Sequence, residues 1–327
     1  MSGVVRFSRC GGPDVLEWAD ERVLPPGPGQ VQIRQRAIGL NFIDIYFRNG
    51  LYPTALPSGL GFEAAGEVTA LGEGVSHLQV GDRVAYGLGP LGAYAQVRNV
   101  PARYVIRVPT GISDEQAAVL MLKGLTAHYL LRQTYRVEAG QTILFHAAAG
   151  GVGSLVCQWA KALGVKVIGT ASSPQKVQYA LDLGAWAMID YSREPVAERV
   201  RELTGGQGVP VVYDGVGQAT WQTSLDCLQR RGLLVSFGNA SGPVSGVELG
   251  VLASKGSLYV TRPTIADYFL NTDEIQRAAD ELFGLVLDGK IAVHIEQRFA
   301  LKDAAQAQAL LETRKTLGAT VLLADAD

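Results

Sequence analysis

The amino-acid sequence predicts an α/β protein with a doubly wound parallel sheet and a second, β-rich region. Three features lead to this fold class. Short apolar or alternating runs separated by glycine fill roughly the first 110 residues. From residue 142 onward, apolar strands alternate with amphipathic helices, and a glycine-rich stretch, FHAAAGGVG, joins the first strand of that series to its first helix.

The β-rich region is predicted from a period of two residues. In QVQIRQRAIG (30–39), Val31 and Ile33 alternate with Gln32 and Arg34, as in a strand with one buried face. The runs FEAAGEVTALG, GDRVAYG and AYAQVRNV are short and bounded by glycine, which favours antiparallel strands joined by tight turns.

The alternating region begins with a buried type of strand, TILFHA (142–147). A helix follows whose apolar residues share one face, and Gly164 is expected to end it. We expect further strands and helices in regular alternation, which implies a parallel sheet with helices on both faces. The expected strands are VKVIGTA (165–171), AMIDY (187–191), VPVVYDGVG (209–217), GLLVSFGN (232–239) and SLYVTR (257–262), with helices near 174–183, near 194–203 and through Leu228.

The C-terminal residues differ from this pattern. A long helix is expected over 271–289, with Asn271 and Glu274 as a possible cap, followed by a strand near 291–299, a helix near 302–315 and a strand in ATVLLA (319–324). We expect this segment to rejoin the first region. The predicted domains are therefore 1–124 with 263–327, and 125–262.

Composition argues against several kinds of site. The net charge of −2, without a long run of one sign, is unfavourable for binding nucleic acid or an acidic membrane. Cys10, Cys157 and Cys227 form no CxxC pair, which argues against a disulfide framework and a cysteine zinc site. No apolar run reaches about 18 residues. These features predict a soluble protein of the reducing cytoplasm.

The glycine-rich stretch matches the G-x-G-x-x-G pattern, with Ala148, Gly150 and Gly153 at its three spaced positions. Small residues there permit a tight turn, a close approach of the backbone to a pyrophosphate, and packing of the helix on the strand. The helix N-terminus adds free N–H groups and a partial positive charge. A dinucleotide-binding loop is thus predicted, and a merely tight strand–helix turn is the alternative.

The end of the second strand indicates which dinucleotide is bound. NAD sites usually carry an acidic residue about 20 residues after the loop. Here the sequence GTASSPQK offers Ser172, Ser173 and Lys176 and no acid. Because hydroxyls and an ammonium favour a 2′-phosphate, we expect NADP(H). The alternative is that Lys176 is an ordinary solvated lysine.

At this point the chain resembles a known family. The segments GLNFIDIYFRNGLYP, GFEAAGEV, GDRVAY, LKGLTAHYLL, HAAAGGVG, SLDCLQRRGLLVSFGN and KGSLYVTRP, in this order, are similar to those of the zinc-free quinone oxidoreductases, which include the ζ-crystallin-like enzymes. These belong to the medium-chain dehydrogenase/reductase superfamily. The resemblance implies a GroES-like catalytic domain, a Rossmann domain, NADPH as cofactor and a homodimer.

The departures from the zinc alcohol dehydrogenases of that superfamily are informative. Where those enzymes have a cysteine and a histidine, this chain has Asn41 and Phe62. Glu63 remains, but one carboxylate does not make a zinc site. We therefore expect no metal, and hydride transfer without a Lewis acid.

The resemblance also implies a set of site residues. Asn41, Tyr46 and Thr126 would lie at the nicotinamide, and Asn41, Tyr46 and Tyr52 are candidates for bonding to the acceptor oxygen. The remaining cofactor-binding candidates are Gly150, Gly151, Val152 and Gly153 at the pyrophosphate, Ser172, Lys176, Tyr191 and Arg314 at the 2′-phosphate, and Phe237, Gly238 and Asn239 beside the nicotinamide.

Structural roles are the alternatives at these positions. The two tyrosines could simply pack under a loop, Asn41 could be a turn residue, and Tyr191 could simply end a strand. Arg314 could favour the dipole at a helix end. Asp44 is expected to cap a local helix, and the four histidines, His146 included, are expected to be structural.

The implied activity is NADPH-dependent reduction of a small-molecule quinone, without zinc or flavin. The alternatives are an NADPH-dependent alkenal or enoyl double-bond reductase, or a non-catalytic crystallin-like protein that binds NADPH or RNA. The apolar strand near 256–262 comes last in the alternating series. We expect it at a sheet edge, where a second subunit would cover it in a homodimer.

Overall fold

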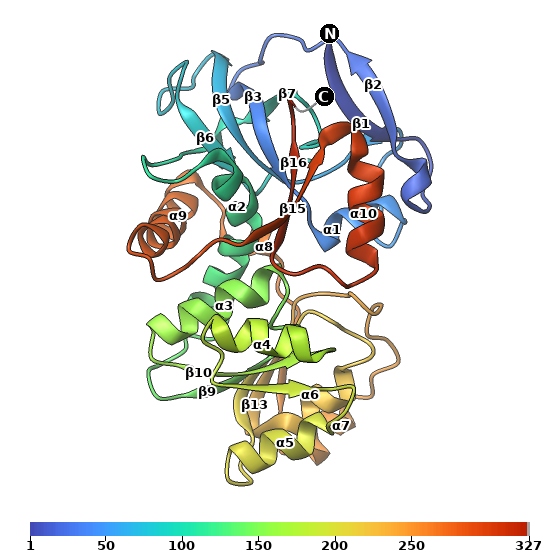
Figure 1. Ribbon diagram of the computed structural model, residues 1–327, viewed down its shortest axis with the longest axis vertical. Helices are drawn as coiled ribbons and strands as arrows, with labels where there is room; N and C mark the ends of the chain where they lie inside the picture. The colour runs from blue at the N-terminus through green and yellow to red at the C-terminus, as the bar shows by residue number, and fades with distance from the viewer. Residues whose placement is uncertain (326–327) are drawn as a thin grey trace. The chain divides into compact units, whose positions relative to one another are not determined.

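The computed structural model describes residues 1–325, and its chain divides into two compact units (Figure 1). Unit 1 comprises Met1–Leu125, Phe269–Gly289 and the chain from Val293 onward. Unit 2 comprises Thr126–Tyr268 and Lys290–Ala292. The domain limits that the sequence suggests, after residues 124 and 262, remain a prediction.

Unit 2 contains the predicted parallel sheet, whose six strands all run in one direction in the order β11-β10-β9-β12-β13-β14. The order reverses between β9 and β12, so the switch point of the fold lies between these two strands. The strands are β9 (Thr142–Phe145), β10 (Lys166–Ala171), β11 (Ala187–Asp190), β12 (Val209–Asp214), β13 (Leu228–Ser236) and β14 (Tyr259–Thr261).

Helices cover both faces of this sheet. Figure 1 shows α3 and α4 on one side and α5 and α6 on the other. Leu144, Ile168, Val212 and Leu234 come from neighbouring strands and are fully buried. The helices are α3 (Gly151–Ala162), α4 (Pro174–Asp182), α5 (Val196–Leu203), α6 (Trp221–Cys227), α7 (Gly250–Ser254) and α8 (Ile265–Tyr268).

Unit 1 is built on mixed and antiparallel sheets. One sheet has the order β15-β16-β3-β5-β6-β8, with β7 also paired to β3, and a smaller sheet has the order β2-β1-β4. The strands are β1 (Ser2–Phe7), β2 (Glu17–Glu21), β3 (Gln30–Gly39), β4 (Ser58–Gly59), β5 (Glu63–Leu71), β6 (Arg83–Tyr86), β7 (Val97–Pro101), β8 (Ile106–Arg107), β15 (Ile295–Ala300) and β16 (Ala319–Leu323).

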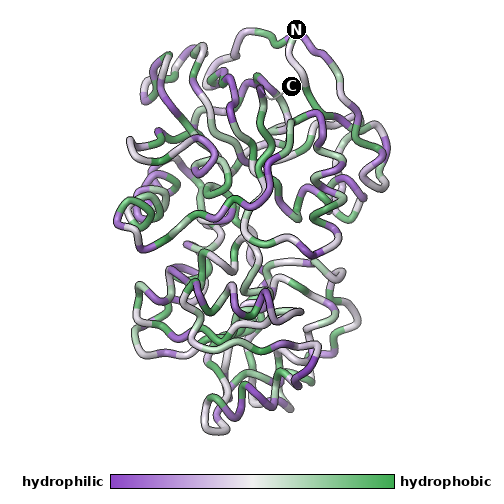
Figure 2. The backbone as a smooth tube through the Cα atoms, viewed as in Figure 1, coloured by the Kyte–Doolittle hydropathy of each residue, from purple (hydrophilic) through white to green (hydrophobic). Residues whose placement is uncertain are grey.

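The C-terminal strand β16 pairs with β3, so the end of the chain rejoins the N-terminal region as the sequence predicts. The helices of unit 1 are α1 (Phe42–Arg48), α9 (Thr272–Leu287) and α10 (Ala304–Glu312), and α2 (Asp114–Tyr129) contributes residues to both units. Figure 2 shows hydrophobic and hydrophilic residues interspersed along α9. The side chain of Asn271 accepts the N–H of Glu274 over 3.0 Å, which confirms the predicted cap of this helix.

The structure differs from the sequence prediction in two places. The sequence pattern gives no sign of α2, because this helix is apolar nearly all round and lacks a polar face. Gly124 lets α9 approach it closely, since a Cβ at that position would lie 2.2 Å from Leu282. The helix expected near 302–315 ends at Glu312, and Arg314 follows it in the left-handed region, with φ of 57°.

No helix within residues 1–325 combines the length and the apolar character that crossing a membrane requires.

Candidate functional site

The glycine loop of unit 2 connects β9 to α3 and leaves the start of that helix open. Gly150 is the N-cap residue, and no side chain caps the helix there. The first turn contains no acidic residue. The free N–H groups and the helix dipole therefore favour an anion at this end of α3.

Gly150 and Gly153 of the loop have different neighbours. A Cβ on Gly153 would lie 2.5 Å from the carbonyl oxygen of Ala147 and 2.6 Å from Cα of Ala148, so only glycine lets α3 pack against the loop. Gly150 is exposed, and a Cβ there would lie 3.2 Å from the same oxygen of Ala147. The loop thus has the small residues that a bound pyrophosphate requires, and the residues present fit a dinucleotide.

The carboxyl ends of β10 and β11 bring three of the predicted 2′-phosphate residues together. Ser172 follows β10 and is exposed, and Lys176 lies in the first turn of α4, which Ser173 caps. The backbone N–H of Tyr191 donates to the carbonyl of Ala171 over 3.1 Å, so this tyrosine lies beside the end of β10. Its side chain is 53% exposed.

An acidic residue, Asp190, also lies beside the end of β10. Asp190 ends β11 and is buried, and its carboxylate accepts hydrogen bonds from the N–H and the hydroxyl of Ser192. These bonds lower the pKa of Asp190. Nε of Arg193 lies 3.7 Å from Oδ2 and offsets the negative charge, while Oδ2 is buried without a hydrogen-bond partner.

The segment Phe237, Gly238 and Asn239 follows β13 at the same edge of the sheet. The N–H of Phe237 donates to the carbonyl of Asp214 over 2.8 Å, and the ring of Phe237 lies 5.6 Å from that of Phe145. The segment is therefore held beside the ends of β9 and β12, at the switch point where open α/β sheets bind their ligands.

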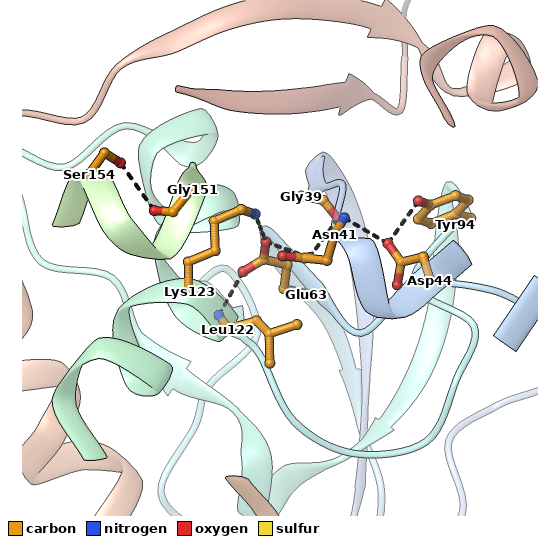
Figure 3. Close-up of polar contacts among 9 residues, drawn as sticks. All are labelled: Gly39, Asn41, Asp44, Glu63, Tyr94, Leu122, Lys123, Gly151 and Ser154. Atoms are coloured by element: carbon orange, nitrogen blue, oxygen red, sulfur yellow. Dashed lines mark hydrogen bonds and ion pairs between the residues drawn. The ribbon is translucent and has the colours of Figure 1, made fainter. Parts of the chain in front are cut away.

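In unit 1, Glu63 is the centre of a buried polar cluster, which Figure 3 shows. Its carboxylate accepts from the side-chain amide of Asn41 over 2.8 Å, from the ammonium of Lys123 over 2.5 Å and from the N–H of Leu122 over 2.6 Å. Glu63 is 0% exposed. Lys123 is also buried, so the two opposite charges offset each other inside the protein.

Asp44 adjoins this cluster and caps α1, as the sequence predicts. Its carboxylate accepts the N–H of Asn41 and the hydroxyl of Tyr94, each over 2.9 Å. Burial raises the pKa of Asp44 to about 7, because the hydrogen bonds offset only part of the lost hydration. One oxygen of Asp44, Oδ1, is buried without a hydrogen-bond partner.

The two tyrosines predicted at the acceptor pack against each other on α1 and the loop that follows it. The ring centroids of Tyr46 and Tyr52 lie 5.3 Å apart in an edge-on arrangement. Phe47 packs against Tyr52 at 5.5 Å and against Phe62 at 5.4 Å. The two tyrosines therefore take part in aromatic packing, the structural role given as the alternative above. Tyr52 also remains partly exposed.

The structure thus brings the predicted residues together in two groups. Asn41, Tyr46 and Tyr52 lie at α1 in unit 1, and the glycine loop, the ends of β10 and β11 and the segment 237–239 lie at one edge of the sheet in unit 2. Thr126 is a residue of α2 assigned to unit 2, and Arg314 belongs to unit 1. The binding roles of all these residues remain predictions.

Sequence reasoning missed Lys123 and the full role of Glu63. The available signal was a lone lysine in AAVLMLKGLTA, because a charge inside an apolar helix requires a partner. Among residues 1–325, no group of three or more His, Cys, Asp or Glu side chains has the arrangement of a metal site.

Comparison with known proteins identifies the chain's relatives. Residues 27–110 match the family model of the alcohol dehydrogenase GroES-like domain, and residues 151–284 match that of the zinc-binding dehydrogenases. A quinone oxidoreductase of Pseudomonas aeruginosa is 60% identical over 99% of this chain and 100% of its own. A 2-haloacrylate reductase from a Burkholderia species is 46% identical over 100% and 99%.

A solved structure agrees with these relatives. The crystal structure of Escherichia coli quinone oxidoreductase complexed with NADPH superposes with a TM-score of 0.97, at 52% identity, over 98% of this chain and 99% of that one. The predicted fold class, a Rossmann sheet with a GroES-like β-rich region, is confirmed. The chain belongs to the quinone oxidoreductase family of the medium-chain dehydrogenase/reductase superfamily.

Proposed function

We propose that this protein is an NADPH:quinone oxidoreductase. The relatives support the activity class, and the Escherichia coli structure supports the cofactor. The observation that carries the proposal is the end of β10. Ser172 and Lys176 lie there without a carboxylate on the strand end itself, and Asp190 on the neighbouring strand accepts from Ser192 through Oδ1. A 2′-phosphate meets hydroxyls and an ammonium at this edge.

The cofactor, when bound, supplies the hydride. The residues of unit 2 bind it: the open start of α3 takes the pyrophosphate, and Ser172, Lys176 and Tyr191 take the adenosine end. Thr126 and the segment 237–239 line the nicotinamide side.

In unit 1, Asn41, Tyr46 and Tyr52 orient the acceptor. Glu63 fixes the amide group of Asn41, because it accepts the Nδ2–H of that side chain. A quinone becomes aromatic on reduction and requires little activation. We therefore propose that the reaction needs neither zinc nor flavin.

A substitution at Lys176 tests the choice of cofactor. A charge-assisted hydrogen bond contributes about 1.5–3 kcal/mol, so Lys176→Ala should weaken NADPH binding roughly ten- to a hundredfold. NADH binding should change little, since NADH lacks the 2′-phosphate. The matched control is Lys161→Ala, an exposed lysine at the end of α3. Fluorescence titration measures both dissociation constants, and equal affinities for NADPH and NADH in the unmodified protein would contradict the proposal.

A second candidate function is reduction of an activated carbon–carbon double bond. The 46% identity to a 2-haloacrylate reductase over the full chain favours it. The two candidates share the cofactor site and differ in the acceptor. Steady-state turnover with 1,4-benzoquinone and with an α,β-unsaturated aldehyde, at saturating NADPH, distinguishes the two candidate functions. The value of kcat/KM should be larger for 1,4-benzoquinone.

We also propose a homodimer that forms through β14. This strand lies at the edge of the six-stranded sheet, as predicted, and its Tyr259 and Val260 are 56% and 38% exposed. An apolar edge of this kind pairs readily with a second copy. Light scattering at micromolar concentration should give a dimeric mass that Val260→Lys lowers. Leu270→Lys, at an exposed leucine of unit 1, should leave the mass unchanged.

The reducing cytoplasm is the proposed location. Cys10 is an exposed free thiol, and Cys157 and Cys227 are buried free thiols. Thiols in this state are typical of proteins kept in a reducing compartment.

A further inference from the structure

A chain of four buried polar side chains lies at the switch point of the unit 2 sheet. His146 follows β9, Thr170 is on β10, Asp214 ends β12 and Ser224 is on α6. All four are buried. Polar side chains are buried together only when hydrogen bonds replace those lost to water. The donors and acceptors of these four side chains must therefore be paired within the protein.

The distances define a continuous path. The hydroxyl of Thr170 lies 3.0 Å from Nδ1 of His146, and Nε2 of the same ring lies 3.0 Å from the hydroxyl of Ser224. Ser224 in turn lies 2.6 Å from Oδ2 of Asp214. The carboxylate is itself fixed, because it also accepts from the N–H groups of Val216 and Gly217.

Donor and acceptor chemistry gives the path one direction. A carboxylate only accepts, so Ser224 donates its hydroxyl hydrogen to Asp214 and must accept from Nε2–H of His146. Nδ1 then has no hydrogen and accepts from Thr170. Burial lowers the pKa of His146, which keeps the ring neutral and compatible with this tautomer.

The path ends at the glycine loop. With its hydrogen directed to His146, the oxygen of Thr170 is free to accept, and the N–H of Ala147 lies 3.3 Å from it. Ala147 has φ of 55°, in the left-handed region that residues other than glycine rarely adopt. The carbonyl of Ala147 accepts the N–H of Gly150 over 2.9 Å, so the orientation of Ala147 is transmitted to the start of α3.

We propose that His146 is a positioning residue of the dinucleotide site, which orients the Thr170 hydroxyl so that it holds Ala147, and with it the loop, in the conformation that accepts a pyrophosphate. This inference depends on the proposed function, because it assigns the loop to a dinucleotide. Ser224 is buried and lies between the aspartate and the histidine. The three residues therefore lack the accessible serine of a hydrolase triad, and their role is to fix the tautomer.

The test removes the hydroxyl that connects the histidine to the loop. Thr170→Val keeps the shape of the side chain but loses both hydrogen bonds, whereas Thr170→Ser keeps the hydroxyl. Thr142→Val, on the neighbouring strand β9, is the matched control. Fluorescence titration gives the dissociation constant for NADPH and for adenosine 2′-monophosphate, which has no pyrophosphate. Thermal unfolding of each variant measures stability separately.

We expect Thr170→Val to weaken NADPH binding about tenfold, or about 1.4 kcal/mol, and to raise the KM for NADPH with little change in kcat. Affinity for adenosine 2′-monophosphate should be unchanged, and Thr170→Ser should restore most of the NADPH affinity.

Unchanged NADPH affinity in Thr170→Val, or equal losses for both ligands, would overturn the positioning role while leaving the proposed function intact. An unmodified protein that fails to bind NADPH would instead refute the proposed function, and the positioning role with it.

Discussion

Replacing Lys123 by methionine should destabilise unit 1 strongly. Methionine keeps the length and the apolar stem of the side chain but removes the ammonium that opposes Glu63. That carboxylate is fully buried and would retain Asn41 and the N–H of Leu122 as donors. Breaking a buried ion pair from one side costs about 3–5 kcal/mol, because the remaining charge is uncompensated.

The assay is thermal unfolding of three variants. For a compact unit of about 150–250 residues, each kcal/mol lowers the midpoint by about 2–4 °C, so Lys123→Met should lower it by at least roughly 6–12 °C. The double variant Lys123→Met/Glu63→Gln should recover much of this loss, since it removes both charges. Lys302→Met, at an exposed lysine, should change stability by less than about 0.5 kcal/mol.

The comparison between single and double variants decides the matter. If adding Glu63→Gln fails to raise the midpoint of Lys123→Met, the charges of the two side chains are not coupled. The stabilising effect of Lys123 would then come from the packing of its buried stem and not from its charge. A midpoint for Lys123→Met within 1–2 °C of the unmodified protein, which is at most about 1 kcal/mol, would contradict the predicted loss of stability.

Three further predictions concern separate parts of the molecule. Burial raises the pKa of Asp44 to about 7, so between about pH 4 and 7 the folded state binds a proton that the unfolded state does not. The free energy of unfolding should therefore fall as the pH rises through that range. Denaturant unfolding of Asp44→Asn should show a smaller dependence on pH. Tyr52→Ala should lower the turnover of quinone more than the affinity for NADPH. Equal losses of turnover and of NADPH affinity would indicate that Tyr52 has only a packing role. EDTA should leave NADPH oxidation by the purified protein intact, and metal analysis should find no stoichiometric zinc; restoration of lost activity by Zn²⁺ would count against the zinc-independent reaction.

The parallel sheet could be predicted because its signal is local. The helix after the glycine loop keeps Leu155, Val156 and Trp159 on a buried face, and Gly164, with φ of 72°, ends it where the sequence indicates. Helix α2 could not be predicted in this way. It is buried nearly all round, so its amphipathic period is absent, and only its contacts with α9 and the strands explain its conformation.

In the candidate site, too, local features could be predicted from the sequence and long-range pairings could not. The glycine loop follows from spacing alone, since Ala148, Gly150 and Gly153 are neighbours in sequence. The pairing of Lys123 with Glu63 joins residues 60 positions apart, and Ser224 meets His146 across 78 positions. Such pairs depend on how strands are ordered in the fold, which no local pattern encodes. Interpreting His146 as structural was therefore correct about its burial but gave no account of its bonds.

The charge on Lys123 also bears on why this chain differs from the zinc-dependent members of its superfamily. Asn41 and Phe62 offer a metal neither a thiolate nor an imidazole, and the acidic Glu63 lies fully buried beside Asn41. An unpaired buried carboxylate is costly, so Glu63 requires an opposite charge or hydrogen-bond donors beside it. Lys123 supplies one positive charge at 2.5 Å, and the amide of Asn41 supplies a further donor. A divalent ion would have to displace that ammonium or lie beside it, and either arrangement is electrostatically unfavourable. The same carboxylate fixes the amide group of Asn41, so the buried ion pair also orients a side chain proposed to bind the acceptor.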